Sequence, residues 1–129
     1  MCSNAAIATA FWRAVGNAEF DRAAAMMAPE AVVDWPLSNE RMPSPGHWRD
    51  VNAHYPGRWH SEIVDIVEHD ETVVTRTRVF NGGISVLAIS YFTIRDDQIT
   101  HLEEYWPETY AAPAWRSPWT VAIREEVAD

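Results

Sequence analysis

The residues best suited to chemistry lie near the C-terminal end, where two glutamates stand side by side within residues 99–106 (ITHLEEYW). The β-branched and aromatic residues of this stretch predict a strand, whose successive side chains point to opposite faces. Glu104 therefore shares a face with Leu102 and Trp106, whereas Glu103 points the other way. The apolar pair beside Glu104 indicates a covered face, where lost hydration favours the neutral carboxyl and raises its pKa. Glu104 is thus a candidate general acid or base; the alternative is a structural carboxylate paired with an arginine.

A second set of candidate residues lies in the stretch 72–80 (TVVTRTRVF). In a regular strand, Thr77 and Val79 occupy the inner face, whereas Arg76 and Arg78 occupy the outer one. A β-bulge that shifted the phase by one residue would turn the arginines inward. A hydrolase function depends on this alternative, because it needs one of the two arginines to face Glu104.

The sequence holds no pattern for a metal or a cofactor, and we expect neither. The five histidines form no i, i+4 pair and no acid cluster lies between them. Cys2 is the only cysteine, which excludes a zinc site built on cysteines and an intramolecular disulfide. The sequence also lacks a phosphate-cradling glycine loop and a nucleophile elbow.

The elements that must position these residues follow from hydrophobic spacing and from turn residues. Helical spacing predicts three helices, at residues 4–15, 19–28 and 47–55, and Pro29 should end the second of them. Residues 37–46, with two prolines and a glycine, are expected to be irregular. Alternating and β-branched residues predict five strands, at 31–35, 58–68, 72–80, 84–95 and 99–106.

This order of elements (ααβαββββ) predicts an α+β fold in a single domain over residues 1–129. Tight turns between the last four strands, among them Asn81-Gly82, make that block antiparallel. A twisted antiparallel sheet with N-terminal helices on one face curls into a cone, whose interior suits a small molecule. The core should span about residues 4–116. The tail, residues 117–129, follows it, and we expect the chain after residue 106 to wrap the body.

Charge narrows the range of partners. The chain carries 19 acids against 10 basic residues, a formal charge of −9, without a basic run. Such a surface repels phosphate backbones and anionic membranes, so we expect neither a nucleic acid nor a membrane as partner. The N-terminus lacks the layout of a signal peptide, and no apolar run approaches membrane-spanning length. A cytoplasmic location is the resulting expectation.

The sequence resembles the nuclear transport factor 2-like, or cystatin-like, superfamily, and within it the SnoaL-like polyketide cyclase branch. The likeness covers about residues 4–116 and rests on these segments: Phe11-Trp12, Phe20-Asp21, Met27 to Glu30, Val33 to Trp35, Pro45-Gly46, Tyr91 to Ile94, Asp97 to Ile99, Glu104 to Trp106 and Ala111 to Arg116. The superfamily includes ketosteroid isomerase, limonene-epoxide hydrolase, polyketide cyclases and domains that only bind. The resemblance therefore predicts the fold more specifically than the function.

The resemblance also suggests roles for particular residues. It sets Glu104 where the epoxide hydrolases have a pocket carboxylate, and it places Asp34 or Trp35 in the cavity, Asp34 as a second catalytic acid or Trp35 as a wall. Thr77 and Val79 stand where those hydrolases carry a catalytic arginine and aspartate, so hydrolysis of that type is not expected. We expect the ligand-binding residues to be Trp35, Tyr55, Thr77, Leu102 and Trp106.

The resulting prediction is a protein that binds an apolar or aromatic small molecule and uses Glu104 for proton transfer in a cyclisation or isomerisation. The alternative is a ligand-binding or dimerisation module without catalysis. The resemblance further implies a homodimer formed through the outer face of the sheet, where five of the predicted side chains lie: Arg76, Arg78, Phe80, His101 and Tyr105.

Overall fold

The computed structural model describes residues 3–124 of the 129-residue chain, so Cys2 and the acidic end at 125–129 lie outside it. The first helix, α1 (Asn4–Gly16), is capped by Ser3, whose Oγ accepts a hydrogen bond from the amide of Ala6. The predicted apolar stripe forms its buried face, which includes Phe11 and Trp12.

The second helix is shorter than predicted. α2 (Phe20–Ala24) ends well before Pro29, and β1 (Met27–Trp35) begins four residues earlier than the predicted strand. The helical spacing of apolar residues continues to Met27, but the helix does not, because Met27 pairs with Ile99 of the last strand. Pro29 lies where the register of β1 shifts, a place at which the missing N–H of proline is tolerated.

The prediction of an irregular stretch at residues 37–46 is wrong, and the predicted element order lacks one strand. After the 3-10 helix η1 (Pro36–Ser38), Asn39 adopts a left-handed conformation with φ of 56°, which asparagine tolerates. The short strand β2 (Glu40–Met42) then returns antiparallel to β1. The third helix, α3 (Pro45–His54), follows, capped by Ser44.

The remaining strands form the predicted antiparallel meander: β3 (His60–His69), β4 (Thr72–Asn81), β5 (Ile84–Arg95) and β6 (Gln98–Tyr105). The turns between them contain residues with positive φ: Asp70, Gly82, Asp96 and Asp97. The sheet order is β2-β1-β6-β5-β4-β3, and β1 runs parallel to β6. The predicted α+β fold with a curved sheet is confirmed, and one parallel strand pair is added to it.

A bulge in β6 decides which of its side chains face inward. The β5–β6 register shifts between Thr93 and Ile94, which leaves Thr100 as an extra residue on β6. Ile99 and Leu102, three residues apart, are therefore both fully buried. Beyond the bulge the strand alternates regularly, and Glu104 points inward as predicted.

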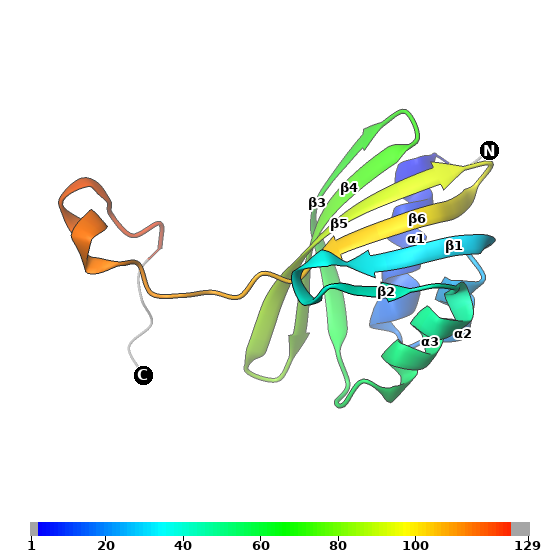
Figure 1. The fold of residues 1–129 in the computed structure, drawn as a ribbon, viewed down its shortest axis with the longest axis horizontal. Helices are drawn as coiled ribbons and strands as arrows, with labels where there is room; N and C mark the ends of the chain where they lie inside the picture. Colours follow the sequence, from blue (N-terminus) through cyan, green and yellow to red (C-terminus); the bar gives the residue numbers. More distant parts are fainter. Residues whose placement is uncertain (1–2, 125–129) are drawn as a thin grey trace.

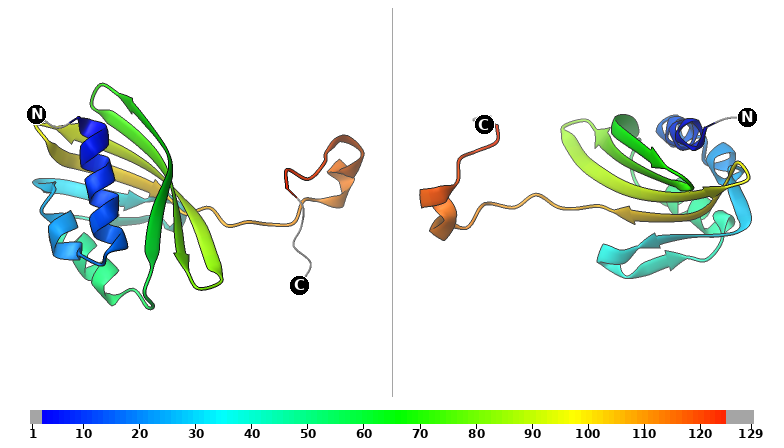
Figure 2. Two further views of the ribbon diagram at one scale, coloured as in Figure 1. Left: turned by 180° about the vertical axis from the view of Figure 1, so that it is seen from behind. Right: turned by 90° about the horizontal axis from the view of Figure 1, so that it is seen from above.

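The helices cover the concave face of the sheet (Figure 1; Figure 2). α1 packs on β3 and β4, while α3 packs on α2 and β1. The ring of Phe11 lies 5.2 Å from that of Trp48 and 5.6 Å, edge to face, from that of Phe92. This core fills the middle of the cone and leaves the end near the C-terminus of β6 for a pocket.

The C-terminal segment, residues 107–124, does not wrap the body as predicted. It leaves the end of β6 and runs away from the sheet to a short 3-10 helix, η2 (Ala114–Trp119), as Figures 1 and 2 show. Pro107 and Pro113 fix φ at their positions and favour extended backbone in the residues before them. The sequence pattern could not reveal this direction, because it depends on contacts outside the segment.

Candidate functional site

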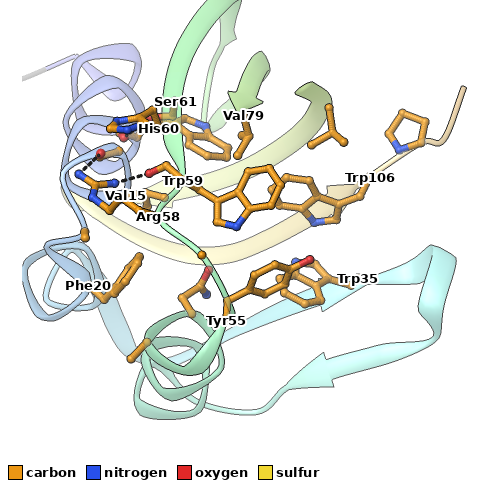
Figure 3. Close-up of a pocket in the computed structure, with 18 of the residues that line it drawn as sticks. Val15, Phe20, Trp35, Tyr55, Arg58, Trp59, His60, Ser61, Val79 and Trp106 are labelled. Atoms are coloured by element: carbon orange, nitrogen blue, oxygen red, sulfur yellow. Dashed lines mark hydrogen bonds between the residues drawn. The ribbon is translucent and has the colours of Figure 1, made fainter. Parts of the chain in front are cut away.

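The open end of the cone contains a cavity of about 550 Å³ (Figure 3). Its walls come from the C-terminal part of α1, the end of α3, the loop that follows α3, and the strand ends near that loop. Four of its lining residues are tryptophans, which contribute large flat apolar surfaces: Trp12, Trp35, Trp59 and Trp106. The lining of this cavity is therefore mainly apolar, and the cavity is open at one end.

The aromatic side chains of the pocket pack edge to face in two pairs. The ring centroids of Trp35 and Trp106 lie 6.1 Å apart at 81°, and those of Tyr55 and Trp59 lie 6.2 Å apart at 84°. Trp59 Nε1 donates to the carbonyl of Pro56 at 2.9 Å, which fixes its ring in the loop after α3. The labelled side chains in Figure 3 show both pairs around one space. These contacts hold the walls in place before any ligand enters.

Glu104 lies behind this wall rather than in it. Its side chain is 3% exposed, and it is not among the residues that line the cavity. Oε1 accepts a hydrogen bond from Trp35 Nε1 at 3.1 Å, and Oε2 accepts one from Ser90 Oγ at 2.9 Å. Burial raises the pKa of the Glu104 carboxyl, although the two hydrogen bonds oppose that shift. The carboxyl is therefore a buried acid joined to the pocket through one indole.

Glu104 belongs to a polar row that crosses the inner face of the sheet. Thr75 of β4, Ser90 of β5 and Glu104 of β6 are paired in register, and all three are buried. A second indole closes the far end of the row, because Trp12 Nε1 donates to Thr75 Oγ1 at 3.1 Å. The row thus ends on a pocket tryptophan at each side. Ser90 was not among the predicted site residues, because no spacing within one strand reveals a partner on the next.

The structure places the five predicted ligand-binding residues at different depths. Trp35, Tyr55 and Trp106 line the cavity, with Tyr55 53% exposed at its mouth. Leu102 is fully buried in the core beneath. Thr77 is also fully buried, and its hydroxyl has no hydrogen-bond partner within residues 3–124.

Asp34 does not face the pocket, so it is not the predicted second acid beside Glu104. Trp35 takes the inner position, and Asp34, next in the chain, points to the outer face of the sheet. There its carboxylate accepts two hydrogen bonds from Arg41, at 2.6 and 2.9 Å, and lies 3.0 Å from His101 Nε2. The hydrogen bonds from Arg41 lower the pKa of Asp34 to about 2, with a smaller effect of His101 and against the opposing effect of burial. This arrangement ties β2 and β6 to β1.

Arg76 and Arg78 also lie on the outer face, because β4 is regular and its inner positions are Val73, Thr75, Thr77 and Val79. Arg76 pairs with Asp65 and Arg78 with Glu62, each at 3.1 Å. The bulge that exists here is in β3, between Ile63 and Asp65, and it leaves the phase of β4 unchanged. Neither arginine faces Glu104, which removes the observation on which a hydrolase function depended.

The loop after α3 supplies pocket residues that sequence reasoning missed. Arg58 and Trp59 of this loop line the cavity, as does His60, the first residue of β3. Arg58 donates to the carbonyls of Gly16 and Trp59. A glycine between Pro56 and Arg58 takes a φ of 93°, so the loop can turn sharply at that point. The Pro56-Gly57 pair was the one available signal, and it indicates a turn without its direction.

The part of the chain that the structure describes contains neither a cluster of metal ligands nor a membrane-spanning helix. Within residues 3–124, no three histidine, cysteine, aspartate or glutamate side chains lie together as a metal site. None of the helices in that range has the length and apolar character to cross a bilayer.

Solved structures share this fold at low sequence identity. A candidate ketosteroid isomerase from Kribbella flavida is 18% identical, with a TM-score of 0.87 over 95% of this chain and 90% of that one. A nuclear transport factor 2-like protein of unknown function from Burkholderia xenovorans is 24% identical, with a TM-score of 0.77 over 92% and 93%. A candidate SnoaL-like polyketide cyclase from Shewanella putrefaciens is 10% identical, with a TM-score of 0.70 over 82% and 90%. At these identities the likeness establishes the fold alone.

Sequence comparison gives the family. No curated protein matches the chain. The family model described as the SnoaL-like domain matches residues 8–102, which contain most of α1, all of α2 and α3, most of the sheet and most of the pocket walls. Glu104 lies just beyond the matched range. Because that match spans well over half of the sequence, this chain belongs to the SnoaL-like domain family.

Proposed function

We propose that this protein binds an apolar or aromatic small molecule in the pocket at the open end of the cone. The observation that carries the proposal is a cavity of about 550 Å³ with four indoles and Tyr55 in its walls. Flat aromatic walls favour flat apolar ligands, since stacked and edge-to-face ring pairs add to the burial of apolar area. Membership of the SnoaL-like family and the ketosteroid isomerase and polyketide cyclase names among its structural neighbours support the same class of ligand.

Titration calorimetry with 2-naphthol, a small neutral aromatic probe, tests this function. Tyr55→Ser and Trp106→Phe should each weaken binding, the first by about tenfold because it removes a ring from the pocket mouth. Tyr55 is half exposed, so its replacement should leave the fold intact. The control is Leu37→Ala, which trims an exposed apolar side chain on η1, outside the pocket. Equal affinity in all four proteins would place the probe elsewhere and contradict the proposal.

The second candidate function is proton transfer by Glu104. It is supported by a buried carboxyl with a raised pKa, 3.1 Å from an indole of the pocket wall. A raised pKa makes the carboxylate a better base for a C–H bond next to a carbonyl, as in isomerisation or cyclisation. Because Trp35 now occupies Oε1, this chemistry requires the indole to move aside when the ligand enters.

Deuterium exchange into 2-tetralone, an aromatic ketone, tests the second function by NMR in heavy water. The Glu104 carboxylate would take a proton from the carbon next to the carbonyl, leaving an enolate, and a deuteron would return to the same carbon. Glu104→Gln should abolish exchange above the buffer rate. Glu103→Gln is the matched control, because this neighbouring glutamate lies on the outer face and accepts a hydrogen bond from Tyr105. Exchange that survives in Glu104→Gln excludes Glu104 as the base. The absence of exchange above the buffer rate in the wild type excludes it as well.

The outer face of the sheet is proposed as a homodimer interface, and the cytoplasm as the compartment. That face has half-buried apolar residues at its centre and charged pairs around them, an arrangement common in protein interfaces. Arg78 lies 4.1 Å above the ring of Phe80, while His101 and Tyr105 lie towards the β1 side. Light scattering tests the proposal: a mass of one chain, 14.7 kDa, at every concentration would exclude the dimer.

A further inference from the structure

The C-terminal segment, residues 107–124, carries large apolar side chains that its own body does not cover. Three aromatic residues of the segment are strongly exposed: Tyr110 at 79%, Trp115 at 70% and Trp119 at 77%. Two aliphatic residues beyond them, Val121 and Ile123, are exposed at 92% and 98%. Single exposed apolar residues are common on protein surfaces, but five within fourteen residues of one segment indicate a surface that another molecule covers.

A second uncovered surface lies on the outer face of the sheet. Val67 of β3, Val74 of β4 and Tyr91 of β5 are neighbours in register, and Val64 lies nearby at the β3 bulge. Val64, Val67 and Tyr91 are exposed at 55%, 56% and 44%. We call these four residues the β3–β5 patch. The patch and the C-terminal segment are thus two uncovered apolar surfaces on one chain.

We propose that the C-terminal segment of each copy packs on the β3–β5 patch of a second copy, so that two chains exchange their segments. This inference rests on the homodimer proposed above and adds to it a component outside the sheet. A reciprocal exchange between two copies closes on itself, so one pair covers both segments and both patches. The exchange also agrees with the direction in which the segment leaves its own body (Figure 1). Pro107 and Pro113 favour extended backbone at the start of the segment and so keep it away from that body.

The area available is that of a stable dimer. A buried aromatic side chain covers about 150–250 Å², so three largely exposed rings on each of two segments, with the surface they cover, would bury about 1,400–2,300 Å² in total. Standard specific interfaces bury roughly 1,200–2,000 Å². The exchanged segments could therefore supply most of a stable interface by themselves.

Sedimentation equilibrium of three proteins tests the exchange: wild type, Trp115→Ser/Trp119→Ser, and the control Leu37→Ser, which removes an exposed apolar residue of η1. The double variant should raise the dimer dissociation constant at least about 100-fold, because buried tryptophans contribute strongly to interfaces. Leu37→Ser should leave it unchanged. A wild-type dimer with unchanged affinity in the double variant overturns the exchange and leaves the homodimer standing. A wild type that stays at the mass of one chain overturns both.

A mixed-copy NMR experiment locates the segment directly. One copy, Cys2→Ser/Ala122→Cys, carries a spin label in the segment, and the other is nitrogen-15-labelled wild type without a spin label. Broadening of the amides of Val67, Val74 and Tyr91 in the labelled wild type supports the exchange, since only an intermolecular contact can cause it. Broadening confined to other surfaces of that copy, or its absence in a mixture shown to be dimeric, overturns the proposal.

Discussion

The indole Nε1 of Trp35 donates a hydrogen bond of 3.1 Å to Oε1 of Glu104, and this contact joins a wall of the pocket to a buried acid. The two residues come from β1 and β6, the one parallel pair among the strands that the structure describes in this sheet. Because Glu104 is 3% exposed, a change in the charge of its carboxyl should change both the stability of the fold and the orientation of that indole.

Stability should fall as pH rises through the folded pKa of Glu104. Burial raises that pKa above its unfolded value, so the contribution of the neutral acid is complete below the unfolded pKa and is lost as pH rises. Glu104→Gln, which cannot ionise, should remove this part of the pH dependence. Urea unfolding of both proteins at about pH 5 and about pH 8 measures it. The same decrease in both proteins would assign the pH dependence to other groups.

Trp35→Phe should make that pH dependence steeper. The variant keeps an aromatic wall but removes the donor to Oε1, one of two hydrogen bonds that oppose the rise of the Glu104 pKa. Trp106→Phe is the matched control, because Trp106 Nε1 has no acceptor within residues 3–124. The difference in unfolding free energy between the two pH values should grow only in Trp35→Phe. Equal growth in both variants would point to altered packing instead.

Two buried threonines on β4 should respond with opposite signs to replacement by valine. Thr77→Val removes a buried hydroxyl that has no partner in the described chain, so stability should be unchanged or higher by about 1 kcal/mol. Thr75→Val removes the acceptor of Trp12 Nε1 and should cost about 1–3 kcal/mol. Urea unfolding compares them on the same strand and face. Equal destabilisation would mean that both hydroxyls have partners.

Asp34→Asn should destabilise the fold at neutral pH by about 1 kcal/mol, since it weakens the hydrogen bonds from Arg41 and His101. The pKa of Asp34 is lowered to about 2, so its contribution is present above the unfolded pKa and is lost as pH falls through the folded one. The control is Asp65→Asn, which removes a more exposed partner of Arg76 and should have a smaller effect. Unfolding at neutral pH and near pH 2 checks both expectations. An effect of Asp34→Asn that persists unchanged at the acid end would contradict an ionic origin.

Local patterns in the sequence were sufficient for the faces of the long strands. The alternation around Glu104 and along residues 72–80 places Glu104 and Thr77 inside and Arg76 and Arg78 outside, as the structure has them. The Asn-Gly and Asp-Asp turns fix where the meander reverses. These features depend on residues close together in the chain, and so the sequence alone predicts them.

Contacts between distant segments decided the rest. Ser90 contacts Glu104 only because β5 and β6 pair in this register. Met27 belongs to the strand β1 only because this part of the chain pairs with β6. Trp59 lines the pocket from a loop that has no periodic pattern. The C-terminal segment runs away from the body, although it is rich in the large apolar residues that are usually buried. The sequence by itself determined which residues are apolar, charged or turn-forming. The tertiary structure decided which of them meet, because pairing, register and burial are properties of chain segments that only the fold brings together.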